Sequence, residues 1–367
     1  MYTEKILERI VTKAPGRTCL FGDHQDYLGL PVIACAINRC IDLKAKKNNG
    51  MELIINKPDI GEKRTIDLKN STYTVKKGDH LLAAIAVLKE YGCIPSHGYD
   101  IEISGNVAIN AGTSSSSAVV LAWIQFLVVA YGCNHPLTKE FLSKIAHRAE
   151  VTFHGAPGGK MDQYSIGMGN IMYMQTDDSN AMELFKGKIP GLIVAESGIP
   201  KDTTGVLGEL KERALLAIHS IKRNLTGFDI RKVNKAELPK FRNYVDDNLK
   251  IYLDAAVLNH HITKQALLEF RKAEWNFQRI GDLMNQHHDV LKNYLNITVP
   301  PIDDMIDGAL TAGALGAKIV GSGRGGSIVV LAREGEQNKV IDALKNSGAK
   351  DAYMVQVDPG ARIIQSK

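Results

Sequence analysis

A short segment rich in glycine and serine is the part of the sequence best suited to bind phosphate. Four serines, Ser114 to Ser117, follow Gly112 and Thr113 and lead into a strongly apolar stretch that is expected to be a helix. The first turn of such a helix offers free backbone N–H groups and the positive end of the helix dipole, and serine hydroxyls there can also ligate Mg²⁺. An ordinary helix N-cap within a flexible Ser/Gly linker explains the segment equally well. The segment therefore does not establish a phosphate site by itself.

A second glycine cluster supports the phosphate interpretation. Residues 321–326, Gly-Ser-Gly-Arg-Gly-Gly, lie between two apolar stretches that are expected to be strands. A simple hairpin needs only about two to five turn residues, so this longer run suggests that backbone approaches something closely. Glycine-rich hairpins are common, but two such clusters in one chain are better explained as two clamps on one nucleotide.

Three charged residues are candidates for phosphoryl transfer to a hydroxyl. That reaction needs positive charge near the moving phosphoryl group, a metal ion, and a carboxylate that orients or deprotonates the acceptor. Arg17 lies in an expected strand, Asp162 follows a glycine-rich turn, and Glu150 lies on an expected helix as a candidate metal ligand. Taken singly, a surface arginine, an aspartate N-cap and a solvated helical glutamate are all commoner than catalytic residues.

A polar cluster near the N-terminus is the candidate acceptor site. Asp23, His24 and Asp26 fall within four positions, but no distant His/Cys pattern supports a metal site there. Carboxylates at this spacing would suit the vicinal hydroxyls of a sugar. A turn rich in aspartate is the structural alternative.

The elements that must position these residues indicate two packed domains, since 367 residues exceed the usual size of one hydrophobic core. We expect domains at 1–190 and 191–367. Expected helices cover 81–88, 114–131, 138–153 and much of 204–295, and expected strands cover 99–103, 171–174, 191–195 and the flanks of 321–326.

Composition excludes several classes of function. Lys plus Arg exceed Asp plus Glu by 45 − 40 = 5, and no basic block of the kind that binds nucleic acid or membranes occurs. The five cysteines form no CxxC pair, which predicts a reducing cytoplasmic location. Neither a secretion signal nor a stretch long enough to span a bilayer is recognisable.

Taken together, these segments resemble the three signature motifs of the GHMP kinase superfamily, named for galactokinase, homoserine kinase, mevalonate kinase and phosphomevalonate kinase. Residues 16–27, Gly-Arg-Thr-Cys-Leu-Phe-Gly-Asp-His-Gln-Asp-Tyr, are similar to the galactokinase signature Gly-Arg-Val-Asn-Leu-Ile-Gly-Glu-His-Thr-Asp-Tyr. Residues 110–118 resemble the phosphate-binding second motif and 318–327 the glycine-rich third. Ala149-Glu150 and Met161-Asp162-Gln163 resemble the segment that carries the catalytic aspartate, so the likeness spans about residues 11 to 335.

This resemblance implies an α+β protein with an N-terminal ribosomal-protein-like domain and a C-terminal ferredoxin-like domain, with the active site between them. It implies an ATP- and Mg²⁺-dependent kinase in which Asp162 accepts or orients the hydroxyl proton and Arg17 stabilises the transferring phosphoryl group. Ser116 and Glu150 would hold Mg²⁺. The sugar would bind to Asp23, His24, Asp26 and Gly159. ATP would bind to Asn110, Ala111, Gly112, Thr113, Ser114, Ser115, Ser116 and Ser117.

Departures from the family pattern bear on the substrate. Asp23 stands where galactokinases usually have Glu, and Leu210 falls near a tyrosine that contacts galactose in the family. Lys160 adds a cation just before Met161-Asp162, where it could bind an anionic group or steady Asp162. The second motif also has Asn110 and Thr113 where Gly and Leu are usual, and Ser117 where Ala is. We therefore expect ATP binding to be retained while the sugar stays open: galactose or a related hexose, pentose or uronic acid, phosphorylated at the anomeric hydroxyl.

Two alternatives remain at this point. One is another GHMP activity of the mevalonate type, which the polar Asp23-His24-Gln25-Asp26 cluster disfavours because it suits a polyol. The other is a non-catalytic sensor of sugar and ATP, which the presence of Arg17, Glu150 and Asp162 disfavours. We expect a monomer or a weak homodimer whose partners are only the sugar and ATP.

Overall fold

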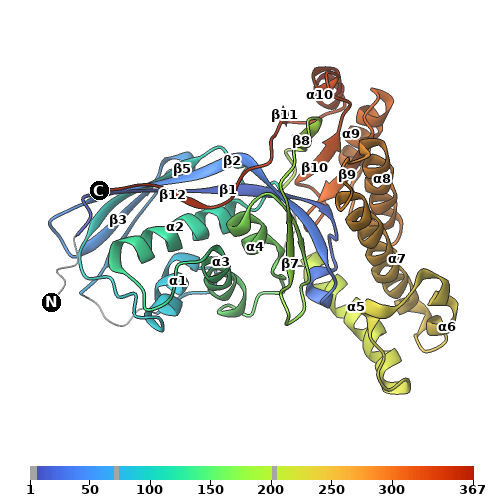
Figure 1. Cartoon of the computed structure of the whole chain (residues 1–367), viewed down its shortest axis with the longest axis horizontal. Coiled ribbons are helices and arrows are strands. Elements are labelled where there is room, and N and C mark those ends of the chain that lie inside the picture. Colours follow the sequence, from blue (N-terminus) through green and yellow to red (C-terminus); the bar gives the residue numbers. More distant parts are fainter. Residues whose placement is uncertain (1–5, 70–73, 201–204) are drawn as a thin grey trace.

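The computed structural model describes residues 6–69, 74–200 and 205–367. Within them, the first sheet has the strand order β12-β1-β2-β5-β3-β4, with β6 paired to β2 and β7 paired to β6 (Figure 1). At the centre of this sheet, β1 and β2 form a long antiparallel pair. The register of this pair shifts twice, between Pro15 and Gly16 and between Cys19 and Phe21. Such bulges bend a strand and redirect its side chains. The strands are β1 (Arg9–Phe21), β2 (Val32–Lys47), β3 (Glu52–Lys57), β4 (Glu62–Asp67), β5 (Tyr99–Gly105), β6 (Ile171–Met174), β7 (Met182–Phe185) and β12 (Arg362–Ser366).

Helices α1 (His80–Lys89), α2 (Ser115–Tyr131), α3 (Lys139–His147) and α4 (Met161–Met168) cover one face of this sheet (Figure 1). The α2 helix is apolar on nearly all sides and packs beneath β1, which explains why Trp123 and Phe126 are fully buried. The expected helix over 138–153 is divided. Its second part is a π-helical turn (Arg148–Thr152) that carries Glu150, and π-helical turns occur often at functional sites.

The second sheet has the order β11-β8-β10-β9 and is antiparallel throughout. Its strands are β8 (Leu192–Glu196), β9 (Gly316–Val320), β10 (Ser327–Leu331) and β11 (Asp351–Met354). The helices of this half are α5 (Gly205–Asn224), α6 (Leu238–Arg242), α7 (Asp247–Phe270), α8 (Phe277–Asn293), α9 (Pro300–Thr311) and α10 (Gln337–Asn346). Short 3₁₀ turns cover Asp26–Leu28, Pro58–Ile60, Ile230–Lys232 and Lys235–Glu237.

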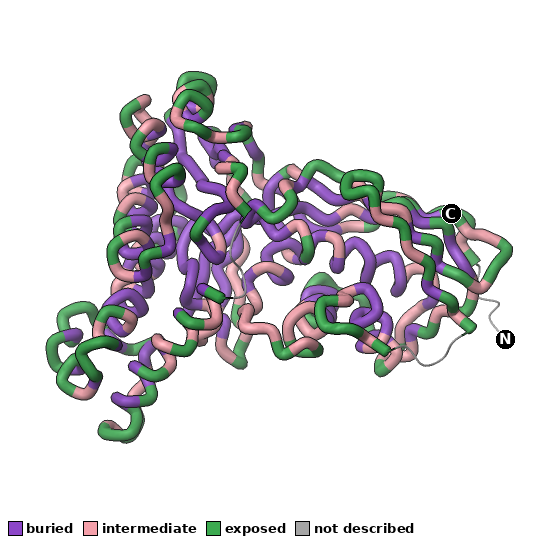
Figure 2. The backbone as a smooth tube through the Cα atoms, turned by 180° about the vertical axis from the view of Figure 1, so that it is seen from behind, coloured by how far each residue is buried: buried purple, intermediate pink, exposed green. Residues whose placement is uncertain are grey.

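One hydrophobic core joins the two lobes. Phe21 and Ile33, at the ends of β1 and β2, belong to the same buried cluster as Ile193 and Ile319 of the second sheet. Figure 2 shows the buried backbone running through this junction, whereas the far ends of α5 and α6 are exposed. The ends of β1 and β9 are therefore fixed against each other, and loops that leave these strands meet at the junction.

The α+β two-domain architecture predicted from the sequence is confirmed. The division at residue 190 stays a prediction, and the chain does not divide there completely, because β12 at the C-terminal end pairs with β1 in the first sheet. In the described part of the chain, no helix has the length and apolar character needed to cross a membrane.

Candidate active site

The serine segment forms a tight loop at the start of α2. Asn110, Gly112 and Ser114 all have positive φ angles, of 56°, 85° and 59°, so the backbone curls before the helix begins. Ser115 opens α2 and Ser114 is its N-cap residue, but the Ser114 hydroxyl does not cap the helix. It donates instead to Asp162 Oδ2 at 2.6 Å. The free N–H groups of the first turn are thus left for another acceptor.

The second glycine cluster packs against the back of this loop. A Cβ atom on Gly112 would lie 2.9 Å from the Val320 carbonyl oxygen, and one on Gly326 would lie 3.2 Å from the Ala111 carbonyl oxygen. The Ser327 hydroxyl donates to that same Ala111 carbonyl. The structure thus brings the two clusters together, and the glycines are required by backbone contact between the two loops. The glycine cluster at 321–326, which we expected to contact the nucleotide, packs in this structure against the backbone of the serine loop.

Arg17 and Asp162 form an ion pair next to the serine loop. Arg17 Nε and one terminal nitrogen donate to Asp162 Oδ1 at 2.9 and 2.7 Å, and the other terminal nitrogen donates to the Gly112 carbonyl. Arg17 is only 3% exposed. Burial acts to lower the pKa of Arg17, but the charge and hydrogen bonds of Asp162, together with the nearby Cys19 and Asp23, outweigh burial and raise it. Asp162 lies in the first turn of α4, so a carboxylate, a guanidinium and a helix N-terminus converge beside the loop.

Glu150 lies on the other side of the loop. Its Oε2 accepts from the Ser117 hydroxyl at 2.6 Å and from Gln163 Nε2 at 2.7 Å. Ser116, which the family resemblance predicts to ligate Mg²⁺ together with Glu150, is exposed and lines the same cavity as Glu150. Ser117 therefore connects the loop to Glu150, and Ser116 faces the open space.

Asp23 is held by the protein itself. Its Oδ2 lies 2.6 Å from Lys318 Nζ, and its Oδ1 accepts from the Gly321 N–H at 2.8 Å. Both side chains are buried, 1% and 0% exposed. Burial acts to raise the pKa of Asp23, but the charges of Lys318 and His287 and the hydrogen bonds from Lys318 and the Gly321 N–H together lower it to about 2. The expected contact of Asp23 with sugar hydroxyls would have to compete with this pair, so the role predicted for Asp23 is not what this geometry favours.

Lys318 was missed as a site residue by sequence reasoning. The feature that could have identified it is a single lysine inside the apolar strand Gly316–Val320, every residue of which is buried. A charge at such a position requires a partner. The partner, Asp23, is 295 positions away in the chain, so the lysine alone could not identify it.

His24 and Asp26 also line this cavity. His24 Nε2 lies 3.1 Å from the Gly321 carbonyl oxygen and Nδ1 lies 3.2 Å from the Tyr27 hydroxyl. Burial lowers the pKa of His24, which keeps the ring neutral. Burial and the nearby Asp162 charge raise the pKa of Asp26 to about 6. Gly159 is needed at its position because a Cβ there would lie 2.0 Å from Asp26 Oδ2.

Lys160 and Leu210, two of the departures from the family pattern, are not among the described residues that line this cavity. Lys160 Nζ donates to the Asp177 carbonyl at 3.1 Å and to Asn180 Oδ1 at 2.8 Å, so these two neutral acceptors hold its ammonium group. Leu210 is buried in the core, and the α5 residue that lines the cavity is Leu207, three positions earlier.

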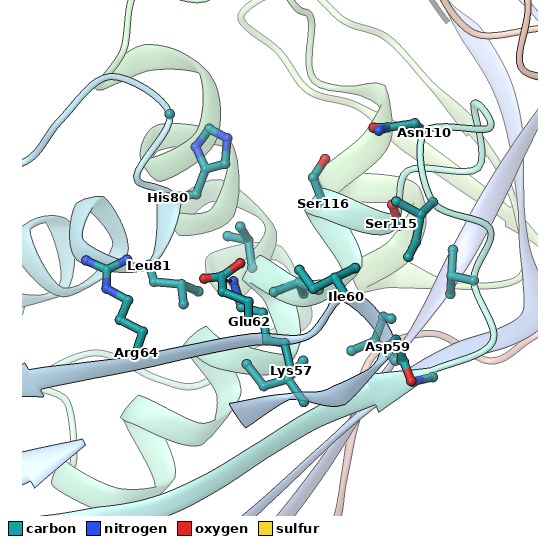
Figure 3. Close-up of a pocket in the computed structure, with 18 of the residues that line it drawn as sticks. Lys57, Asp59, Ile60, Glu62, Arg64, His80, Leu81, Asn110, Ser115 and Ser116 are labelled. Atoms are coloured by element: carbon teal, nitrogen blue, oxygen red, sulfur yellow. Dashed lines mark hydrogen bonds and ion pairs between the residues drawn. The ribbon is translucent and has the colours of Figure 1, made fainter. Parts of the chain in front are cut away.

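Two adjoining cavities flank the serine loop. One, of about 370 Å³, is lined by Arg17, Asp26, Asp162 and Glu150 together with His24 and Gly159. The other, of about 430 Å³, is bordered by Lys57, Ile60, Glu62 and Leu81 and reaches the loop at Ser115 (Figure 3). His80, Asn110 and Ser116 line both cavities. The site therefore offers two connected compartments, with the phosphate-type loop between them.

A carboxylate and a guanidinium beside such a loop, with a polar compartment on one side and a larger one on the other, form the arrangement of a small-molecule phosphotransferase. Comparison with models of known families identifies the family of the chain. Residues 75–170 match the GHMP kinases N terminal domain, 270–350 match the GHMP kinases C terminal domain, and 2–46 match the galactokinase galactose-binding signature. The chain belongs to the GHMP kinase superfamily, as its motifs predicted.

Relatives of two activities are about equally similar in sequence. A mevalonate kinase of Thermococcus sibiricus is 28% identical over 93% of this chain and 94% of that enzyme. A galactokinase of Pyrococcus furiosus is 26% identical over 92% of this chain and 93% of that enzyme.

Solved structures share the fold. The galactokinase of Lactococcus lactis, crystallised with galactose, superposes with a TM-score of 0.86 at 22% identity, over 97% of this chain and 95% of that one. The mevalonate kinase of Methanococcus jannaschii gives a TM-score of 0.71 at 21% identity, over 95% of this chain and 98% of that one.

Proposed function

We propose that this kinase transfers the γ-phosphoryl group of ATP to a hydroxyl of a neutral monosaccharide, namely the anomeric C1 hydroxyl of galactose or a closely related sugar. The observation that carries the proposal is the Arg17–Asp162 pair, which lies between the serine loop and a cavity that also contains His24 and Asp26. ATP would lie with its nucleoside in the larger cavity and its phosphates along the loop, which leaves the smaller cavity for the sugar.

The residues of the site have distinct parts in this reaction. His24 and Asp26 bind sugar hydroxyls and orient the acceptor. Asp162 takes the proton of the acceptor hydroxyl as its oxygen forms a bond to the γ-phosphorus, and ADP leaves with the electrons of the broken P–O bond. Arg17 offsets the negative charge that spreads over the transferring group, and the loop N–H groups bind the phosphate oxygens.

Glu150 and its neighbours would fit a magnesium ion that is bound together with ATP. Mg²⁺ takes oxygen ligands and is usually bound in kinases through one or two protein groups plus substrate phosphates. Glu150 and the Ser116 hydroxyl supply such oxygens from the same cavity wall. No group of three or more His, Cys, Asp or Glu residues that could hold a metal alone occurs among the described residues, which agrees with an ion that needs ATP. The ion would neutralise phosphate charge.

The charges of the smaller cavity favour a neutral acceptor over mevalonate or a uronic acid. Among the described residues that line it, Arg17 is the only lysine or arginine, and it is already paired with Asp162. The lining also contains four carboxyl groups: Asp23 and Asp162 are paired with Lys318 and Arg17, whereas Asp26 and Glu150 have no ion pair among the described residues. A carboxylate on the substrate would meet Asp26 and Glu150 without an unpaired cation, which disfavours binding. Sequence relatives make a mevalonate kinase the second candidate, and this cavity argues against it.

The pKa of Asp26 predicts a pH dependence of the acceptor reaction. Asp26 is ionised only above about pH 6, and an ionised carboxylate binds sugar hydroxyls more strongly than a neutral one. We expect kcat/KM for the sugar to fall as the pH is lowered through about 6, because this ratio reports groups of the free enzyme. In Asp26→Asn, kcat/KM should be lower throughout and this acid limb should disappear. An unchanged limb in Asp26→Asn would assign it to another group.

The raised pKa of Asp26 has the opposite effect on the stability of the unliganded protein. Because the folded-state pKa lies above the unfolded one, this group contributes its full stability below about pH 4 and loses it as the pH rises through about 6. A comparison of thermal unfolding of the wild type and Asp26→Asn across this range measures the effect separately from activity.

The proposed metal site predicts a specific response to Glu150→Gln. We expect the Mg²⁺ concentration for half-maximal activity to rise by about 10- to 100-fold, as is typical when a residue around a metal is changed. The matched control is Glu140→Gln, an exposed glutamate of α3 outside both cavities. Titration of ADP release with Mg²⁺ at fixed ATP and sugar measures the difference. An unchanged Mg²⁺ requirement in Glu150→Gln would remove Glu150 from the proposed metal site.

A binding screen tests the proposed substrate class. A ligand that binds only the folded state raises the melting temperature according to its affinity. With a non-hydrolysable ATP analogue present, galactose or a related neutral sugar should raise the melting temperature, and glucuronate, galacturonate and mevalonate should not. Stabilisation by mevalonate alone would favour the second candidate.

A further inference from the structure

We propose that His80 binds the polyphosphate chain of ATP from the side opposite the serine loop, a proposal that rests on the proposed function. The two cavities share His80, Asn110 and Ser116. A nucleotide with its nucleoside in one cavity and its γ-phosphoryl group in the other must pass these three residues. Figure 3 shows His80 on one side of the space, with Ser116 and Asn110 on the other.

The position of His80 is fixed by the residues around it. It is the first residue of α1, and its neighbour Asp79 caps that helix by accepting from the Leu82 N–H. Arg64 holds the same Asp79 carboxylate with two hydrogen bonds, of 2.8 and 2.6 Å. The ring of His154 packs edge-on against the His80 ring, with 5.1 Å between centroids. The imidazole of His80 is therefore presented to the shared space by ordered neighbours.

The imidazole nitrogens lack partners on the protein side. His80 Nδ1 and His154 Nε2 are shielded from solvent and have no hydrogen-bond partner within the described chain. Shielded polar atoms without partners are rare in native proteins and call for an explanation. A phosphate oxygen is a strong acceptor, and an imidazole has an N–H to donate whether it is neutral or protonated. A polyphosphate between His80 and the loop would give the His80 ring, which lines both cavities, such an acceptor.

The other cations around the two cavities are engaged. Among the described lining residues, Lys57 pairs with Glu62 at 3.0 Å, Arg64 with Asp79 and Arg17 with Asp162. The serine loop itself contains no lysine of the kind that reaches the β- and γ-phosphates in a Walker loop. His80 is thus the basic side chain left facing the phosphate path. Its contact would be to the phosphates, with no direct part in nucleoside or sugar recognition.

Calorimetric binding of two probes tests this assignment. The probes are a non-hydrolysable ATP analogue and adenosine, which lacks phosphates. The variants are His80→Gln, which removes the imidazole, His80→Lys, which restores a phosphate-binding cation, and the control His219→Gln at an exposed position of α5. We expect His80→Gln to bind the analogue at least about tenfold more weakly, the loss typical of a hydrogen bond to a charged group. Adenosine binding should be unchanged, and His80→Lys should recover most of the affinity.

Each other result overturns the proposal in a recognisable way. Equal losses for adenosine and the analogue would place His80 in the nucleoside site, and no loss for either would remove it from the nucleotide. If His80→Lys did not recover affinity for the analogue, His80 would not act as a phosphate-binding basic side chain. Absence of analogue binding by the wild type would overturn the proposed function itself. Because no sugar is present, an error in the proposed sugar class leaves the result unaffected.

Discussion

Replacing Asp162 with Asn is expected to lower kcat by about 10²- to 10⁴-fold, the range typical for loss of a general base. The amide cannot take the hydroxyl proton, and it removes the charge that pairs with Arg17 at 2.7 Å. An amide oxygen can still accept from the Ser114 hydroxyl, which lies 2.6 Å from the carboxylate. Binding of the sugar and of the ATP analogue should therefore change by less than about tenfold, so the loss should appear in kcat rather than in KM.

The matched control is Asp304→Asn, an exposed aspartate on α9, which should leave kcat unchanged. Steady-state ADP release measures both variants. If Asp162→Asn kept more than about a tenth of the wild-type kcat, Asp162 would not be the proton acceptor. If sugar binding were lost together with kcat, Asp162 would act mainly by holding the acceptor.

Lys318→Met is expected to lower the free energy of unfolding by about 3–5 kcal/mol, the usual cost when one member of a buried ion pair is removed. The variant leaves the Asp23 carboxylate buried without its counter-charge, since Asp23 is 1% exposed and Lys318 0%. In the double variant Lys318→Met with Asp23→Asn, no charge remains uncompensated and the amide oxygen can still accept from the Gly321 N–H. The double variant should regain much of the lost stability.

Urea unfolding of the wild type, Lys318→Met, the double variant and Lys345→Met tests this prediction. Lys345 is half exposed and 3.9 Å from Asp351, so its removal should cost less than about 1 kcal/mol. A Lys318→Met protein as stable as the wild type would show that the pair is not a structural link between β1 and β9.

The contribution of Asp23 to the free energy of unfolding also depends on pH with a defined sign. Because the pKa of Asp23 is lowered to about 2, its contribution is complete above about pH 4 and is lost as the pH falls toward 2.

The parts of the site that are local in sequence were predictable. The serine loop, its helix and the Arg17 strand were expected from residue types alone, because turn residues followed by an apolar run determine a loop and a helix with little help from distant segments. The resemblance to GHMP motifs then assigned Asp162 and Glu150, and the structure places both beside the loop.

The parts of the site that sequence reasoning could not place depend on contacts between distant segments. The neighbours of Asp23 in the sequence favour a role in sugar binding. In the structure Asp23 pairs with Lys318, which lies nearby only because β9 packs against β1. Lys160 precedes Asp162 by two positions, but its side chain leaves in another direction and meets Asn180. Leu207 rather than Leu210 reaches the cavity, because the burial of an α5 residue depends on where the helix meets the core. Side-chain direction of this kind is set by tertiary packing.

Substrate identity is the point at which sequence likeness is least decisive. Relatives with the two activities are similarly distant, at 28% and 26% identity. The structure adds that the smaller cavity, in its described lining, has two carboxyl groups without an ion pair and one arginine that is already paired. This charge balance is the basis of our proposal that the acceptor is a polyol rather than a carboxylate.

The most direct measurement is ADP release by the purified wild-type protein with Mg²⁺ and ATP, in parallel reactions that contain galactose, other neutral hexoses and pentoses, uronic acids or mevalonate. The account predicts that at least one neutral sugar stimulates ADP release and yields a phosphorylated sugar, and that the acidic acceptors give only the background rate. Stimulation by mevalonate, or tight binding of a sugar without any turnover, would contradict it.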